Sequence, residues 1–241
     1  MLQNPSDQAQ EPRLPLRALS EFEGSLSQRA YLSLREAIMA LKLKPGTLLR
    51  KPEICEGLGV SRSPVSEAMA RLAGEGLVDI VPQAGSFVSR FSMAELKEGA
   101  FLREAIELHA VGHVAETITD DTLKLLRRNI RIQEALVEDG DFAGFYAQDA
   151  ELHAMILAAT GFRRIAQVAD TAWVQVNRAR QLVLPVPGRV AETLDEHRAI
   201  LAALEARDPV AARAAMRHHL GQLMTFIQPL ERDHPDYFEP S

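Results

Sequence analysis

The chain has 241 residues, 46% of them hydrophobic and 25% charged, which is usual for a soluble protein of one or two domains. Its longest run without Asp, Glu, Lys or Arg is the 13 residues 218–230, too short to cross a bilayer. The single cysteine, Cys55, cannot form a disulfide within the chain. Composition therefore argues against a membrane protein or a disulfide scaffold, and favours a cytoplasmic location.

Charge is distributed unevenly along the chain. Residues 1–91 contain 11 Lys and Arg against 10 Asp and Glu, whereas residues 92–241 contain 16 against 23 and hold all seven histidines. This contrast predicts two domains with different partners. The near-neutral first part does not by itself indicate nucleic-acid binding, since such domains usually carry a basic excess.

The first predicted elements are three short helices. Residues 1–22 combine Gln, Pro, Ser and charged side chains without periodicity, and we expect a disordered arm there. Within the next part, residues 23–91, apolar residues recur at helical spacing from Leu26 onward. A second helix is predicted near Pro52, because proline suits a first helical turn. A third follows Gly59, which permits a tight turn between two helices.

A β-hairpin is predicted after the third helix. Residues 77–81 and 86–88 are β-prone runs that flank the sequence Pro-Gln-Ala-Gly. Three helices followed by a hairpin make a winged helix-turn-helix domain. Residues 23–91 are therefore expected to have this fold.

Residues 92–229 show helical periodicity and no further strand-like run of weight. Ser92 with Glu95 forms a capping box that opens the first helix. Six helices are predicted, over residues 92–118, 120–140, 141–160, 162–184, 190–206 and 208–229. The expected fold class is mainly α, a winged helix-turn-helix followed by an all-α bundle of six to seven helices. The last residues, 230–241, are expected to form a loose tail.

Candidate DNA contacts lie at the start of the third predicted helix. A recognition helix presents short hydrogen-bonding side chains and an arginine at its N-terminus, where it enters the major groove. Ser61, Arg62 and Ser63 occupy that place. Gly85, at the hairpin tip, permits backbone to approach the minor groove. The alternative is a simple helix cap with Arg62 as a solvated surface charge.

Candidate metal ligands fall at core positions of three helices in the bundle. Asp149 and His153 lie one turn apart on one apolar stripe, and His197 and His219 each interrupt a stripe on another helix. A buried, unpaired aspartate is costly, and a divalent metal held by one carboxylate and three neutral imidazoles offsets that cost. Such a ligand set suits Zn, Ni, Mn or Fe. Hydrogen-bonded core histidines and a salt-bridged Asp149 are the alternative.

Two further residues are candidates for binding an organic acid. Arg103 falls on the inward stripe of the first bundle helix, where its guanidinium can hold a carboxylate with two parallel hydrogen bonds. An ion pair with Glu107, one turn later, is the alternative. Asn177, one turn after Trp173, either lines the same pocket or packs beside the tryptophan.

The first part of the chain resembles the DNA-binding domain of the GntR family of bacterial transcription regulators. The resemblance spans residues 26–90 and rests on YLSLREAIMALKLKPGTLL, LGVSRSPVSEAMARLAGEGLV and GSFV. It implies DNA contacts from Ser61, Arg62, Ser63 and Gly85.

Two positions depart from the pattern of that family. The family usually has Arg where this chain has Ser66, and often a basic residue near Pro52. The loss of these positive groups removes phosphate or base contacts, so we expect a different operator preference. Arg50 and Lys51 are candidates for compensating contacts.

The second part resembles the all-helical effector domain of the FadR-type subfamily, the FCD domain, over residues 93–228. The resemblance rests on Asp149 with His153, on EHRAILAAL around His197 and on AARAAMRHHL around His219. It implies that these four residues bind a metal and that a small carboxylate effector binds beside it.

The sequence therefore predicts a ligand-responsive transcription regulator and not an enzyme. We expect a repressor that binds a pseudo-palindromic operator in double-stranded DNA as a homodimer. The main alternative is a metal-dependent enzyme acting on a small organic acid, with Glu107 or Glu151 as the base. A heme or acyl-CoA sensor is a weaker alternative, because the acyl-CoA branch of the subfamily does not keep this ligand set.

Overall fold

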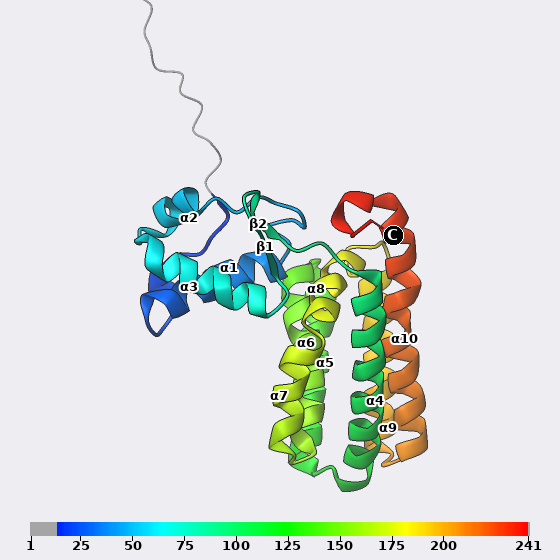
Figure 1. The fold of residues 1–241 in the computed structure, drawn as a ribbon. Helices are drawn as coiled ribbons and strands as arrows, with labels where there is room; N and C mark the ends of the chain where they lie inside the picture. Colours follow the sequence, from blue (N-terminus) through cyan, green and yellow to red (C-terminus); the bar gives the residue numbers. More distant parts are fainter. Residues whose placement is uncertain (1–13, 241) are drawn as a thin grey trace, which may run out of the picture. The chain divides into compact units, whose positions relative to one another are not determined.

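The computed structural model describes residues 14–240, except for the side chains of residues 166, 170 and 171. Residues 14–240 form ten α-helices, two short 3-10 helices and one two-stranded sheet (Figure 1). The chain divides into two compact units, Met1–Ser89 and Arg90–Ser241. The predicted fold class, mainly α with a winged helix-turn-helix before an all-α bundle, is confirmed.

The first unit contains three helices and a hairpin in the predicted order. They are α1 (Leu26–Met39), α2 (Lys51–Leu58), α3 (Arg62–Gly74), β1 (Val78–Val81) and β2 (Gly85–Val88). Gly59 ends α2 in the left-handed conformation, with φ at 67°, and this turn lets α3 begin at Arg62. The strands pair antiparallel, with Val78 opposite Val88, and both of these side chains are buried.

Part of the predicted N-terminal arm is ordered. Residues 1–13 lie outside the described residues, but Leu19–Glu21 form the 3-10 helix η1. Arg17 forms an ion pair with Glu21 at 2.7 Å and with Glu36 of α1 at 2.9 Å. A disordered arm that ends at residue 22 is therefore wrong for residues 14–22, where Arg17 pairs with Glu36 and the Ser33 hydroxyl of α1 donates to the Arg17 carbonyl at 2.8 Å.

The second unit is a helical bundle. Its elements are α4 (Met93–Thr117), α5 (Asp120–Asp139), α6 (Phe142–Ala159), α7 (Arg163–Ala172), α8 (Val174–Val183), α9 (Arg189–Glu205), α10 (Pro209–Asp233) and the 3-10 helix η2 (Pro235–Tyr237). The single helix predicted over 162–184 is divided at Trp173, whose φ of −128° lies outside the helical range and whose side chain is buried. Seven bundle helices in the described chain agree with the predicted six to seven.

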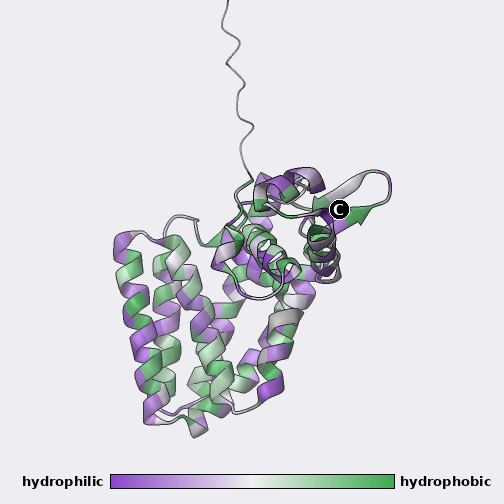
Figure 2. Cartoon of the chain, turned by 90° about the vertical axis from the view of Figure 1, so that its left-hand side faces the viewer, coloured by the Kyte–Doolittle hydropathy of each residue, from purple (hydrophilic) through white to green (hydrophobic). Residues whose placement is uncertain are grey.

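Side-chain caps and amphipathic faces explain these helices. Ser92 Oγ accepts a hydrogen bond from the Glu95 amide, and Asp141 caps α6 through the Gly144 amide at 2.8 Å. The bundle helices carry both hydrophobic and hydrophilic residues along their length (Figure 2). Apolar residues of α4, α5, α6, α9 and α10 meet in one core. No helix among residues 14–240 has the length and apolar content needed to cross a membrane.

The C-terminal segment packs on the start of the bundle. Helix α10 continues through Pro229 to Asp233, and Phe238 is only 3% exposed. The Phe91 amide donates to the Tyr237 carbonyl at 2.9 Å, and the Phe91 and Phe238 rings lie 5.5 Å apart. The predicted loose tail over 230–241 is therefore wrong for the described residues. The tail is mostly polar, so its sequence did not indicate that the Phe238 ring packs on Phe91, a residue far away in the chain.

Candidate metal centre and nucleic-acid surface

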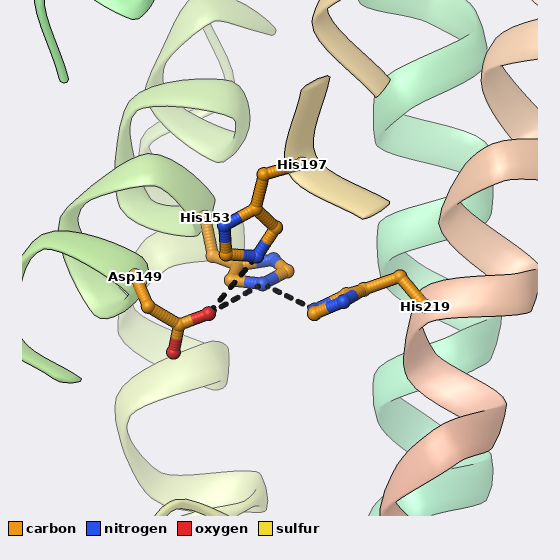
Figure 3. A group of neighbouring side chains, drawn as sticks. All are labelled: Asp149, His153, His197 and His219. Carbon is orange, nitrogen blue, oxygen red and sulfur yellow. Dashed lines mark hydrogen bonds and ion pairs between the residues drawn. The ribbon is translucent and has the colours of Figure 1, made fainter. Parts of the chain in front are cut away.

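Asp149, His153, His197 and His219 converge inside the bundle (Figure 3). All four side chains are buried, and one ligand atom from each lies within 4.8 Å of the others. Asp149 and His153 come from successive turns of α6, His197 from α9 and His219 from α10. Helical spacing predicted that each would point inward, and the structure brings all four together.

The outer ring nitrogen of each histidine already has an oxygen partner. For His197 this partner is the side-chain oxygen of Gln133. The Gln133 amide NH2 group donates to Asn129 Oδ1 at 2.6 Å, so the Gln133 oxygen faces His197. An oxygen at Nδ1 places the imidazole proton there and leaves the Nε2 lone pair directed at the centre. The three contacts are His153 Nδ1 to Glu107 Oε2, His197 Nδ1 to Gln133 Oε1 at 2.7 Å and His219 Nδ1 to Glu196 Oε2 at 2.7 Å.

Lone pairs therefore face one another at the centre of the cluster. His153 Nε2 lies 3.0 Å from His219 Nε2, and His197 Nε2 lies 3.0 Å from Asp149 Oδ1. Asp149 Oδ1 and His197 Nε2 are buried and have no hydrogen-bond partner among the described residues. Electron-pair donors at these distances repel unless a cation lies between them. One carboxylate and three imidazoles fit a divalent Zn, Ni, Mn or Fe ion.

Burial keeps the three histidines in the form that binds a metal. It lowers the pKa of His153, and it lowers the pKa values of His197 and His219 well below the usual value, with further lowering from neighbouring imidazoles and arginines. Burial opposes ionisation of Glu107, but the charge of Arg103 and the hydrogen bonds from Arg103 and His153 outweigh it and hold the pKa of Glu107 well below the usual range. At neutral pH the site therefore combines neutral imidazoles with an ionised Glu107.

A cavity adjoins this cluster. It is small, with about 30 Å³ of space for the centres of water-sized molecules, and its lining includes Asp149 and His219. Three arginines also line it, and each is paired: Arg103 with Glu107 at 2.6 Å, Arg189 with Glu196 at 2.6 Å, and Arg180 with Asp149. Burial lowers the pKa of Arg180 to about 10, so it remains cationic at neutral pH.

The two predicted acid-binding residues have different positions. Arg103 agrees with both predictions made for it, an inward position and an ion pair with Glu107, since it lines the cavity and also pairs with Glu107. Asn177 is not among the cavity-lining residues; its Oδ1 accepts from Arg180 Nη1 at 3.4 Å, and its carbonyl accepts from the Tyr146 hydroxyl at 2.7 Å. The structure therefore places Asn177 behind an arginine rather than on the cavity wall.

Sequence reasoning missed several residues of this site. Arg180 lies on α8. Because of the break at Trp173, the helical period did not predict which face of the helix Arg180 lies on. Arg189 is the first residue of α9, directly after Gly188, and lies one residue before the helix predicted over 190–206. Its spacing to Glu196, two turns later, was the available signal that both lie on one face of the helix.

The predicted DNA contacts lie at the start of α3 in the first unit. Ser61 is the N-cap residue, but its side chain makes no cap hydrogen bond. Ser61, Arg62 and Ser63 are all exposed, and Ser66 is half-buried one turn further along the helix. Arg50 is exposed before α2 and forms an ion pair with Glu53 at 3.0 Å. The Ser61, Arg62 and Ser63 side chains are therefore exposed to solvent, and the Ser61 side chain does not cap the helix.

Gly85 has a structural reason to be glycine. Its φ is +127°, and a Cβ there would lie 2.9 Å from Leu48 Cδ1. It is exposed and is the first residue of β2, opposite Val81. Both its backbone conformation and the contact with Leu48 favour glycine, independently of any approach to DNA.

Three helices with an antiparallel wing, joined to a helical unit with a buried ligand cluster, define a winged-helix DNA-binding protein with a separate sensor-like domain. Comparison with known proteins agrees. The bacterial regulatory proteins of the gntR family match residues 26–88, and the FCD domain matches residues 98–222. The chain belongs to the GntR family, in the group that carries an FCD domain.

Relatives and solved structures support this assignment along most of the chain. An HTH-type transcriptional regulator from an unstable DNA locus of Streptomyces ambofaciens is 33% identical over 91% of this chain and 93% of its own. The HTH-type transcriptional repressor RspR of Escherichia coli K12 is 30% identical over 88% of this chain and 93% of its own. E. coli McbR/YncC has the same fold, with a TM-score of 0.74 at 22% identity over 86% of this chain and 99% of that one. The protein is a bacterial DNA-binding transcription regulator.

Proposed function

We propose that this regulator is a ligand-responsive repressor that binds a pseudo-palindromic operator as a homodimer. A divalent metal and a small organic acid bind in its helical unit. The observation that carries the sensor half is the convergence of lone pairs from Asp149, His153, His197 and His219 in a buried site. The relative RspR is named a transcriptional repressor, which supports repression rather than activation.

The DNA half of the proposal rests on the N-terminus of α3. Ser61, Arg62 and Ser63 are exposed where a recognition helix enters the major groove. Ser66 on α3, Arg50 before α2 and Gly85 in the wing are the further candidate contacts. A symmetric dimer presents two such helices, which is why the operator should be an inverted repeat.

Charge balance supports an acidic effector. Around the cavity, the three arginines are matched by the carboxylates of Glu107, Glu196 and Asp149. A divalent metal adds two positive charges to a buried region, where uncompensated charge is costly. A carboxylate bound beside the metal and held by Arg103 or Arg180 would offset that excess.

A metal-dependent enzyme is less well supported. Glu107, one of the two candidate bases, already accepts from Arg103 and His153. Glu151, the other candidate, is exposed on α6. A general base must reach the reacting water or substrate, and neither carboxylate is free inside the site to do so.

The proposal is tested by selecting duplexes from a random DNA pool with the purified full-length protein. At about physiological salt, where nonspecific phosphate binding is weakened, we expect an inverted repeat to be enriched. That repeat then serves as the probe for organic acids that release the protein in the presence of zinc. Enrichment of single half-sites would contradict the dimer, and no enrichment with or without zinc would contradict operator binding.

Substitution of Arg62 tests the recognition surface. We expect Arg62→Ala to weaken binding to the selected operator by about 10- to 100-fold, because one bidentate base contact is worth ~1–3 kcal/mol. Since Arg62 is exposed, its removal should leave the unfolding temperature unchanged. An unrelated duplex of the same length is the control. Equal loss on both duplexes would show a phosphate contact instead of base recognition.

A further inference from the structure

Two of the four candidate metal ligands are held by buried carboxylates on other helices. Glu107 of α4 binds Nδ1 of His153 on α6, and Glu196 of α9 binds Nδ1 of His219 on α10. Glu107 is 1% exposed and Glu196 is 9% exposed. Each contact crosses between two helices, so it constrains an imidazole ring that the backbone of its own helix leaves free to rotate.

The same two carboxylates hold arginines of the cavity wall. Glu107 Oε1 accepts from Arg103 Nε at 2.6 Å while Oε2 faces His153. Glu196 accepts from Arg189 at 2.6 and 2.7 Å, and its Oε2 also accepts from the His219 ring. Two chains of arginine, glutamate and histidine therefore run from the cavity to the centre of the cluster. Nδ1 of the remaining histidine, His197, instead faces the neutral amide of Gln133.

We propose that Glu107 and Glu196 are positioning residues of the metal centre. They turn His153 and His219 so that Nε2 faces the metal, and they strengthen these imidazoles as ligands by accepting their Nδ1 protons. Arg103 and Arg189 hold the two carboxylates in place. This inference rests on the metal site proposed above and assigns the residues that orient its ligands.

An ordinary buried ion pair explains less of this geometry. A carboxylate that only neutralised a neighbouring arginine would have no reason to place an oxygen on a histidine of another helix. Here each glutamate lies on one helix and accepts a hydrogen bond from a histidine on another helix. The same arrangement occurs twice, at His153 and at His219. Glutamine cannot replace either of them fully, because its single carbonyl oxygen can accept from the histidine only by turning its NH2 group towards the arginine.

Zinc affinity of the full-length protein tests the role of the two glutamates. Glu107→Gln and Glu196→Gln should each weaken zinc binding by about 10- to 100-fold, measured by competition with a chelating dye. The matched controls are Glu104→Gln on α4 and Glu205→Gln on α9, whose side chains are 45% and 37% exposed. The controls should bind zinc like the unsubstituted protein. If both buried variants also do so, the positioning role is wrong.

The tautomers of the histidines give a second, independent readout. In metal-free protein labelled with 15N-histidine, NMR should show the proton of His153 and His219 on Nδ1. Glu107→Asp, which keeps the charge but withdraws the carboxylate, should weaken that preference at His153 and leave His219 unchanged. A proton on Nε2 in the unsubstituted protein would overturn the inference even where a glutamine variant fails to fold.

Failure of the metal site itself looks different. If the unsubstituted protein and both surface controls do not bind zinc, the proposed metal centre is wrong and the positioning role is wrong with it. If all three bind zinc and the buried glutamine variants bind it equally well, only the positioning role is wrong.

Discussion

His218 and His219 are neighbours in the sequence with opposite environments. His219 is 7% exposed and faces the ligand cluster, whereas His218 lies on the outer surface of α10. Successive residues of an α-helix point about 100° apart, so only one of the pair can face the bundle interior. The chain thus offers a matched pair of substitutions for testing the metal site.

His219→Ala should lose metal that His218→Ala retains. The expected result is a stoichiometric divalent metal in the unsubstituted protein and in His218→Ala, and little or none in His219→Ala, measured by elemental analysis after zinc loading and dialysis. Operator binding should persist in both variants, because α3 belongs to the other unit. Full metal content in His219→Ala would contradict its role as a ligand.

The buried histidines also predict how stability depends on pH. Burial lowers the pKa values of His153, His197 and His219 below their unfolded value of about 6.5. Below that pH the unfolded chain binds more protons than the folded one, so the free energy of unfolding falls as the pH falls. Above it, the contribution of these histidines is fully present. The lowered pKa of Glu107 adds a further loss of stability only as the pH falls below its unfolded value of about 4.3.

Urea unfolding of the metal-free protein at about pH 7.5 and about pH 5.5 measures this effect on the helical unit. We expect a lower free energy of unfolding at the lower pH. The His219→Ala variant should show a smaller pH dependence, because one depressed pKa has been removed. Equal stability of the unsubstituted protein at both values would contradict neutral, buried histidines.

Individual elements depend on where glycine occurs. Gly85 begins β2 at φ +127°, and a Cβ at this position would lie 2.9 Å from Leu48 Cδ1. Gly74 ends α3, and a Cβ there would have no atom within 4 Å. A side chain is strained at the first position and accommodated at the second. The hairpin therefore requires glycine for its backbone, and the helix does not.

Gly85→Ala should destabilise the first unit by about 1 kcal/mol or more, because alanine is strained at positive φ. Gly74→Ala should be neutral or stabilise it by about 0.4–1 kcal/mol, since it restricts the unfolded chain at a helical position. Urea unfolding followed by far-UV circular dichroism compares the two variants. Similar effects of both substitutions would show that the conformation of Gly85 is not required for stability.

In the molecule as a whole, the candidate DNA contacts and the candidate metal ligands belong to separate units. The first unit has its own buried residues from α1, α3 and the hairpin, and the cluster of Asp149, His153, His197 and His219 lies wholly in the second. A ligand that binds only the folded second unit should therefore stabilise that unit directly.

Zinc should raise the unfolding temperature of the second unit. At a free concentration about 100 times the dissociation constant, one bound ion adds about 2.7 kcal/mol to the free energy of unfolding. Differential scanning calorimetry of the full-length protein should show this shift, and His219→Ala should not show it. A zinc-dependent shift that persists in His219→Ala would place the bound metal elsewhere.

The local order of this protein could be predicted from its amino-acid sequence. Proline, glycine and capping residues set most helix boundaries, and the helical period showed that Asp149, His153, His197 and His219 point inward. It also indicated the exposed Ser-Arg-Ser start of α3. These are properties of a segment and its own neighbours, so they can be predicted without knowing how the segments pack.

Which of the inward polar groups contact one another depends on how the helices pack. Glu107 binds His153 across 46 residues, and Gln133 binds His197 across 64. Periodicity shows which face of a helix is buried, but not the rotation and offset of the helix packed against it, and these determine each contact. The same holds for Phe238, whose polar surroundings predicted a loose tail although its ring packs on Phe91.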